Sequence, residues 1–247
     1  MFCEDLYRLG SIFPTAQSET ENRIICCTNH PQIPFSVVMS NVIPDHAVGG
    51  RAGLRFSLYT YSEDGKERRD NIPRSTLDRF VIHFDDAKIT REQIFHYVYA
   101  VLHHPDYRAR YAENLKRELP RIPLRGTAED FHAFAKAGRK LADLHIGYEA
   151  VKPYKLQRIE NREAPVNWRV EAMKLSKDGR TVIYNDWLAL DGIPPEAHEQ
   201  RLGNRSALAW VIDQYRIERR LRRRGASRGC GSAVGKPPFL VILLPLR

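Results

Sequence analysis

The sequence predicts an α+β fold in which a mixed β-sheet carries a helical hairpin and additional helices. Three observations support this class. Short runs of β-branched and aromatic residues lie between breaks rich in Pro and Gly up to residue 61, apolar residues recur at helical spacing over residues 90–148, and strand-like runs return after Pro153. Strands and helices that segregate along the chain in this way are typical of α+β domains.

The first strands are predicted from three short runs, 23–28 (RIICCT), 35–40 (FSVVMS) and 54–61 (LRFSLYTY). These runs are rich in the residues that strands favour, and the breaks NHPQIP and IPDHAVGGRAG between them are typical of loops. A fourth run, 78–84 (DRFVIHF), fits either a strand or a short helix.

Two longer helices are predicted from their N-terminal caps and apolar spacing. Thr90-Arg-Glu-Gln93 has the form of a capping box. The apolar residues that follow at helical spacing are Ile94, Val98, Val101 and Leu102. A further helix at 128–147 has Thr127 as its expected N-cap. On or near one face of that helix lie Phe131, Phe134, Ala135, Leu141, Ala142 and Leu144.

A shorter helix is predicted between these two. Pro105 fits its first turn, where the missing N–H costs nothing. The helix is expected to end near Glu118 because Pro120 cannot continue it. An apolar stripe at intervals of four is formed by Tyr107, Tyr111 and Leu115. Such regular spacing indicates core packing rather than a platform for stacked bases.

Strands are predicted again at 166–174 (VNWRVEAMK), 180–185 (RTVIYN) and 187–190 (WLAL), with a hairpin turn at Lys177-Asp178-Gly179. A short helix is expected to start at Ile193-Pro-Pro-Glu196, and a last helix to open at Asn204 or Ser206. The expected apolar face of the last helix consists of Leu208, Val211, Ile212 and Tyr215.

The composition changes abruptly after Ile217, where the chain reads ERRLRRRGASRGCGSAVGKPP. We therefore expect one domain at 1–217, with a mainly helical segment at 90–148, and a basic, aberrant or disordered tail at 218–247.

Composition limits the classes of function. The 247 residues include 39 Lys and Arg against 30 Asp and Glu, a formal net charge of +9 that favours a polyanionic partner. The four cysteines show neither the spacing of a zinc site nor a disulfide framework, and the lack of a disulfide framework fits a reducing cytoplasm. The N-terminus lacks the apolar core of a signal peptide, and the run FLVILLP is far shorter than the roughly 20 residues of a membrane span.

No catalytic motif stands out. His96, His103 and His104 lack the spacing and the carboxylate of a zinc site, and we interpret them as residues that cap or flank a helix end. A metal-dependent nuclease would have to use Asp45, Asp86 and Lys88. Other patterns fail in detail: Gly235-Lys236 is followed by Pro237 rather than Ser or Thr, Tyr184-Asn-Asp-Trp187 lacks the prolines of an adenine methyltransferase loop, and no Gly-x-Ser-x-Gly elbow occurs.

Basic residues, by contrast, gather in three segments. The shorter helix predicted from Pro105 to near Glu118, together with the segment after it, carries Arg108, Arg110, Lys116, Arg117, Arg121 and Arg125. The predicted hairpin carries Lys174, Lys177 and Arg180, and the turn before the last helix carries Arg201, Asn204 and Arg205. Each cation alone is typical of a solvated surface, but together with the net charge they indicate a nucleic-acid interface.

Long stretches of the chain then resemble a known family. They include ENRIICCTNHPQIPFSVVMSNVIPDHAVGG, ITREQIFHYVYAVLHHPDYRARYAENLKRELPRIP, AGRKLADLHIGYE and VNWRVEAMKLSKDGRTVIYNDWLALDGIPPEAHEQRLGNRSALAWVIDQY. In this order they resemble the C-terminal specificity domain, or target-recognition domain, of type ISP restriction–modification enzymes and related adenine-specific DNA methyltransferases. The resemblance ends near Tyr215, and the basic run from Arg216 onward is interpreted as a frameshifted or truncated end.

The resemblance implies sequence-specific recognition of double-stranded DNA, with no cofactor, metal or catalytic site in this chain. S-adenosylmethionine, ATP and Mg²⁺ would serve the methyltransferase, helicase-like and nuclease core of the parent enzyme, with which this chain would be partnered. The alternatives are a stand-alone metal-dependent nuclease and a gene fragment without function.

Candidate DNA contacts follow from the basic segments and two polar loops. The hairpin around Lys177 and the turn at Asn204-Arg205 are the favoured contact points, because they are polar loops next to rigid elements. The full set of candidates is Arg108, Arg110, Lys116, Arg117, Arg121, Lys174, Lys177, Arg180, Asn185, Asn204 and Arg205.

Overall fold

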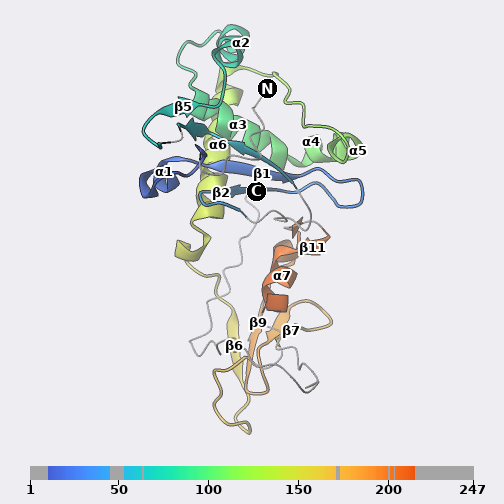
Figure 1. The fold of residues 1–247 in the computed structure, drawn as a ribbon. Coiled ribbons are helices and arrows are strands. Elements are labelled where there is room, and N and C mark those ends of the chain that lie inside the picture. Colours follow the sequence, from blue (N-terminus) through green and yellow to red (C-terminus); the bar gives the residue numbers. More distant parts are fainter. Residues whose placement is uncertain are drawn as a thin grey trace. The chain divides into compact units, whose positions relative to one another are not determined.

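The three runs predicted as the first strands form sheets in the computed structural model (Figure 1). Strands β1 (Ile24–Thr28), β2 (Val37–Ser40) and β3 (Gly53–Ser57) pair antiparallel in the order β2-β1-β3. Every residue of the central strand β1 is buried. The third run breaks at Leu58, after which β4 (Tyr59–Tyr61) pairs with β5 (Arg68–Asp70) in a separate ribbon.

The structure describes residues 11–44, 53–62, 64–170, 173–199, 201–202 and 204–214. They group into two compact units: unit 1 is the chain up to Tyr148 together with Leu202–Asn204, and unit 2 is the rest, from Glu149 onward. The division into one domain at 1–217 and a tail stays a prediction, and residues 218–247 lie outside the described part.

The described part of unit 1 contains six α-helices. They are α1 (Ala16–Glu21), α2 (Arg74–Phe84), α3 (Arg91–His103), α4 (Pro105–Arg110), α5 (Ala112–Leu115) and α6 (Ala128–Ile146), and the single turn η2 (Tyr148–Ala150) follows α6. The ambiguous run 78–84 is thus helical. Both predicted caps are confirmed, because Thr90 and Thr127 each form a complete capping box at the start of α3 and α6.

The shorter helix predicted from Pro105 to near Glu118 is divided at Tyr111, whose φ and ψ of −109° and 18° are not helical. Pro105 occupies the first turn of α4 as expected, and α5 ends at Leu115, before Pro120. Tyr107 and Leu115 are buried, which confirms that the apolar stripe belongs to the core.

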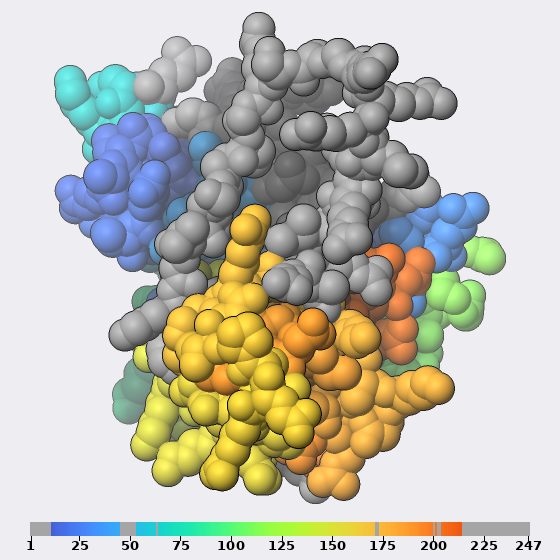
Figure 2. Space-filling model, turned by 90° about the horizontal axis from the view of Figure 1, so that it is seen from below, coloured from blue at the N-terminus to red at the C-terminus, as the bar shows by residue number. Residues whose placement is uncertain are grey.

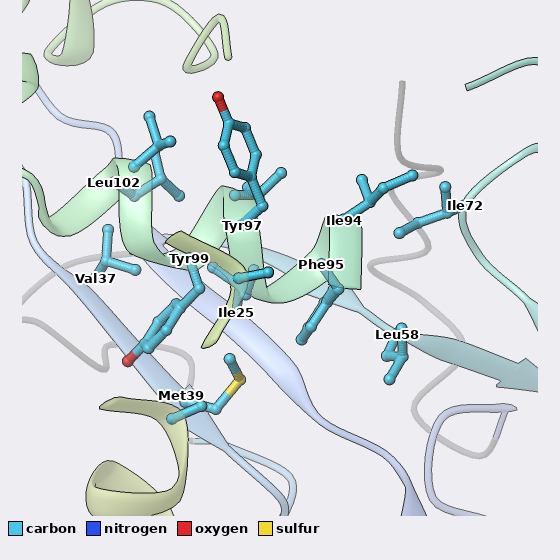
Figure 3. Packing of buried hydrophobic residues seen from close by; sticks show 14 of the residues in the cluster. Ile25, Val37, Met39, Leu58, Ile72, Ile94, Phe95, Tyr97, Tyr99 and Leu102 are labelled. Carbon is cyan, nitrogen blue, oxygen red and sulfur yellow. The ribbon is translucent and has the colours of Figure 1, made fainter. Parts of the chain in front are cut away.

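In the core of unit 1, helix α3 packs with one face against the sheet and with another face against α6. Figure 3 shows Phe95 and Tyr99 pointing from α3 toward the strands that carry Ile25 and Met39, while Tyr97 points the opposite way. On α6, the ring of Phe131 is fully buried, and its centroid lies 5.1 Å from that of Tyr97.

Close packing of α3 on α6 depends on one glycine. Gly138 lies in the middle of α6, where a Cβ atom would be placed 1.9 Å from the carbonyl oxygen of His96 and 3.2 Å from the Cβ of Ala100. Only a residue without a side chain lets the two helices approach this closely.

Unit 2 is built on a four-stranded antiparallel sheet in the order β6-β9-β8-β7. The strands are β6 (Gln157–Glu160), β7 (Lys174–Leu175), β8 (Thr181–Ile183) and β9 (Leu188–Asp191). The strand predicted at 166–174 is wrong at 166–170 and at 173 and right at 174, while residues 171–172 lie outside the described part. The edge strand β6 was not predicted. The expected turn at Lys177-Asp178-Gly179 is present, with Gly179 at a φ of +75°.

The rest of unit 2 contains the 3₁₀ turn η3 (Pro195–His198), β11 (Arg205–Ser206) and helix α7 (Ala207–Gln214). Between η3 and β11 in the chain lies β10 (Arg201–Leu202), whose second residue is assigned to unit 1. Ser206 caps α7 by accepting a hydrogen bond from the Ala209 N–H at 3.2 Å. Leu208 and Ile212 are buried as expected, whereas Val211 is 39% exposed and Tyr215 lies outside the described residues.

The α+β class is therefore confirmed, in the form of several small sheets instead of one mixed sheet. Every strand pair whose register is described is antiparallel. In the described parts of the chain, no helix is both long enough and apolar enough to span a bilayer.

Candidate nucleic-acid interface

The basic side chains of α4, α5 and the segment after them differ in their surroundings. Arg108 is half-buried, and its guanidinium donates to the Phe35 carbonyl oxygen at 2.5 Å, which fastens α4 to the segment before β2. Burial lowers the pKa of Arg108. This arginine therefore supports the fold, and we do not retain it as a DNA contact.

The remaining predicted cations of this region lie at the surface of unit 1. Lys116 pairs with Glu113 at 2.6 Å, and Arg121 pairs with Glu118 at 3.4 Å. The exposed side chains of Arg110 and Arg117 complete the set. Because acidic neighbours offset two of the four cations, this surface is only moderately basic.

The β7–β8 hairpin of unit 2 carries a second group of predicted contacts, Lys174, Lys177 and Arg180, all exposed. Within the described residues these three cations form no ion pair. The turn that carries them is held by Asp178, whose Oδ1 accepts hydrogen bonds from the Ser176 hydroxyl at 2.6 Å and the Arg180 N–H at 3.1 Å. These two hydrogen bonds lower the pKa of Asp178. The hairpin thus presents unpaired positive charge on an ordered turn.

The predicted contact Asn185 has a different place. Its side chain is buried, and its amide nitrogen donates to the carbonyl oxygens of Asn167 at 2.7 Å and Arg169 at 2.9 Å. Its Oδ1 accepts from the N–H groups of Trp187 at 2.9 Å and Leu188 at 2.8 Å. All of its polar atoms are engaged inside unit 2, so Asn185 positions the surrounding loop instead of facing a ligand.

The turn before α7 keeps Asn204 and Arg205 exposed, as expected of contact residues. Arg205 forms an ion pair with Asp213 of α7, and its guanidinium carbon lies 5.7 Å from the ring centroid of Trp210. The arginine is therefore held against α7 while part of its side chain remains accessible.

Sequence reasoning missed one surface feature of unit 2. The guanidinium of Arg158, on β6, lies beside two indole rings, with its central carbon 4.7 Å from the centroid of Trp168 and 5.5 Å from that of Trp187. Its Nε forms an ion pair with the carboxylate of Glu160 at 2.7 Å. The sequence signal was the Asn167-Trp-Arg169 stretch, which we assigned to a strand.

Two of the three histidines lie at a helix end as predicted, since His103 is the last residue of α3 and His104 is its C-cap. The prediction is wrong for His96, which lies inside the helix. His96 is buried, and Arg23 Nη1 lies 3.3 Å from its Nε2, while the ring of His103 lies between the carbonyl oxygens of Tyr99 and Val37. Among the described residues, no three His, Cys, Asp or Glu side chains are grouped so that they could hold a metal.

The residues of the nuclease alternative are engaged in other contacts. Asp86 Oδ2 lies 2.8 Å from His132 Nε2, and its Oδ1 accepts the Lys88 N–H at 2.8 Å. These hydrogen bonds lower the pKa of Asp86. Asp45, the other carboxylate of that hypothesis, lies outside the described residues.

The cysteines offer no reactive thiolate in the described chain. Cys26 and Cys27 are buried in β1, and burial raises the pKa of each thiol to about 12. A thiol with so high a pKa stays protonated at neutral pH and is a poor nucleophile or metal ligand.

Replacement of Asn185 by alanine is expected to destabilise unit 2 by about 2–3 kcal/mol, because buried hydrogen-bonding groups lose their partners. The three tryptophans of the chain, Trp168, Trp187 and Trp210, all lie in unit 2, so their fluorescence during urea unfolding measures this loss. Asn161→Ala serves as the control, since Asn161 is exposed and its removal is expected to cost less than about 1 kcal/mol. Equal losses for the two variants would contradict the positioning role of Asn185.

Comparison with known proteins identifies the family to which the chain is similar. The family model described as the Type ISP C-terminal specificity domain matches residues 4–226. A search of the curated proteins found no match.

Solved structures similar to the chain include the following three. The structure of a DrdV–DNA complex matches with 36% sequence identity and a TM-score of 0.74, over 84% of this chain and 21% of that one. A nuclease-deletion mutant of the type ISP restriction–modification enzyme LlaGI, in complex with a DNA substrate mimic, matches with 32% identity and a TM-score of 0.66, over 85% and 18%. The ATP-dependent type ISP enzyme LlaBIII bound to DNA matches with 26% identity and a TM-score of 0.70, over 87% and 14%. The chain thus spans about a fifth or less of the length of these three chains.

Proposed function

The chain belongs to the type ISP C-terminal specificity domain family, and we propose that it recognises a sequence in double-stranded DNA as the specificity part of a restriction–modification enzyme. The observation that carries this proposal is the match with the DrdV–DNA complex, which extends over 84% of the chain at 36% identity. The basic net charge of +9 supports the same conclusion, because cations bind DNA through its phosphates.

Two kinds of contact are needed for such recognition. Phosphate contacts fix the position of the protein on the duplex, and contacts to base edges select the sequence. The unpaired cations of the β7–β8 hairpin, Lys174, Lys177 and Arg180, are the best candidates for phosphate contacts. The other candidates are the exposed residues Arg110, Arg117, Arg121, Asn204 and Arg205 and the half-buried Lys116.

Methyl transfer and DNA cleavage would be carried out by other parts of an enzyme of this family. We propose that S-adenosylmethionine, ATP and Mg²⁺ act there, in an adenine-N6 methyltransferase, a helicase-like motor and a nuclease with which this domain works in the cytoplasm. In this arrangement the chain determines where on the DNA the other parts act.

The proposal is tested by selection of bound duplexes from a random pool with the purified chain, followed by sequencing and salt titration. One short enriched site is expected, with an affinity that falls steeply as the salt concentration rises. Binding without any enriched site would show that the basic surface alone is active and would contradict sequence recognition. Incubation of the same DNA with Mg²⁺ also tests the nuclease alternative. That alternative requires the chain to cleave the DNA and the Asp86→Ala variant not to cleave it.

A further inference from the structure

The guanidinium of Arg158 is more strongly fixed than that of an ordinary surface arginine. The rings of Trp168 and Trp187 lie 4.8 Å apart at an interplanar angle of 77°, and the guanidinium lies against both. The ion pair from Nε to Glu160 limits its rotation further. Contacts of a cation with two aromatic faces are favourable and hold the plane of the group in one orientation.

This fixed group is nevertheless accessible. The side chain of Arg158 is 46% exposed, and Trp168 is 44% exposed. Within the described residues, the two terminal amino groups of Arg158 have no hydrogen-bond acceptor. β6 is an edge strand whose four residues are all exposed, and Figure 2 shows the segment around it (yellow) at the surface of unit 2. An oriented pair of donors therefore faces solvent.

The loop that carries Trp168 is irregular but firmly held. Three consecutive carbonyl oxygens, those of Asn167, Trp168 and Arg169, each accept a hydrogen bond from a buried side chain. The donors are the amide of Asn185 and the hydroxyl of Tyr184, the latter at 2.8 Å from the Trp168 oxygen. Trp168 is thereby kept in place to orient Arg158 before any ligand arrives, which reduces the entropy lost on binding.

We infer that Arg158 is a specificity-determining residue that donates both terminal amino groups to a guanine in the major groove of the recognised DNA, with Trp168 as its positioning residue. The inference rests on the proposed function and adds to it the base and the residue that reads it. A planar fork of two donors requires two adjacent acceptors. In the major groove, guanine presents such a pair at O6 and N7, whereas adenine offers one acceptor next to a donor.

The adjacent carboxylate favours a base over a phosphate. The Glu160 oxygen lies 2.7 Å from Arg158 Nε, so a phosphate bound to the same guanidinium would lie near a second negative charge. A guanine edge carries no net charge and does not suffer this repulsion. The cations Lys174 and Lys177, which form no ion pair within the described chain, are better suited to phosphates.

The experiment compares duplex-pool selections by the full chain and by Arg158→Lys, which keeps the charge but loses the planar fork. In the wild-type site one position is expected to require guanine, and in the variant this preference is expected to fall on the order of tenfold. Preferences at the other positions and the salt dependence stay the same. Trp168→Leu, which leaves Arg158 intact, is expected to weaken the preference at the same position by a smaller factor.

Arg162→Lys is the matched control, since Arg162 is exposed in the loop that follows β6 and undergoes the same chemical change. It is expected to leave every preference unchanged. Tryptophan fluorescence unfolding of each variant verifies that unit 2 is folded. An equal loss of affinity for all sequences would overturn the inference and assign Arg158 to a phosphate, and an unchanged guanine preference in both variants would also overturn it. Absence of an enriched site with the wild-type chain would instead contradict the proposed function itself.

Discussion

Replacement of Gly138 by alanine is expected to destabilise unit 1 by about 3 kcal/mol, because the added methyl group overfills a closely packed contact. In an exposed helix the same change is favourable by roughly 1 kcal/mol, so the expected effect has the opposite sign. The new Cβ would lie 1.9 Å from the His96 carbonyl oxygen, a backbone atom that no rotamer change can move. Helix α6 would have to shift away from α3 and lose contacts along its buried face.

The measurement is urea unfolding followed by far-UV circular dichroism, which reports on the long helices α3 and α6 of unit 1. Gly147→Ala, at the C-terminal end of the same helix, is the matched control. Its Cβ would meet only the Asp143 carbonyl oxygen, at 3.1 Å, and the residue has a negative φ of −95°. A Gly138→Ala variant as stable as the Gly147→Ala variant would mean that α3 and α6 are not packed as closely as described.

Acidification is expected to destabilise unit 1 between about pH 6.5 and pH 4 through three histidines. Burial lowers the pKa of His96, His103 and His145 to about 4, against about 6.5 for an unfolded histidine. At His103 the facing carbonyl oxygens of Tyr99 and Val37 act in the opposite direction, but burial outweighs them.

The sign follows from proton uptake. Below about pH 6.5 the unfolded chain binds protons at these positions, whereas the folded chain remains unprotonated until about pH 4, so falling pH favours unfolding. By pH 5 each histidine is expected to have removed about 2 kcal/mol of stability, relative to pH 7.5. Above pH 7.5 the three residues contribute no pH dependence.

The measurement is the free energy of unfolding by urea at pH 5 and pH 7.5, with circular dichroism as the signal. His96→Gln is expected to reduce the difference between the two pH values, since it removes one of the three groups. His83→Gln is the control, because His83 is exposed at the end of α2. A wild-type protein equally stable at both pH values would contradict the neutral, buried state of these histidines.

The elements predicted correctly are those with a local signal. Thr90 and Thr127 cap their helices by hydrogen bonds to residues three positions away, and Pro105 fixes its own φ. The strand expected at 166–174 failed for the opposite reason. Its residues suit a strand, but Tyr184 and Asn185, distant in sequence, take up the backbone oxygens that a strand would offer to a neighbour. The polar strand β6 has little strand propensity and forms because β9 pairs with it.

The sequence indicates which charged residues of the candidate site are exposed, but it does not indicate which residues its side chains contact. Exposure of Lys174, Lys177 and Arg180 follows from a polar hairpin, which sequence composition indicates well. Whether an Asn or Arg side chain faces inward depends on which partners surround it, and so Asn185 and Arg108 were assigned to the surface. Arg158 was not noticed because its indole neighbours come from positions 168 and 187, on other segments.

Tyr184 and Asn185 fix the 167–169 loop by hydrogen bonds to its backbone carbonyl oxygens. Every amino acid supplies such an oxygen. The shape of this loop therefore depends little on the side chains at 168 and 169, whereas the side chain of Asn167 contributes by accepting a hydrogen bond from the Arg169 N–H at 2.9 Å. Substitutions at 168 and 169 can change the chemistry presented at the surface while the backbone path is preserved. If the chain recognises DNA as proposed, a single substitution in this loop would change the groups presented to the DNA without compensating changes elsewhere.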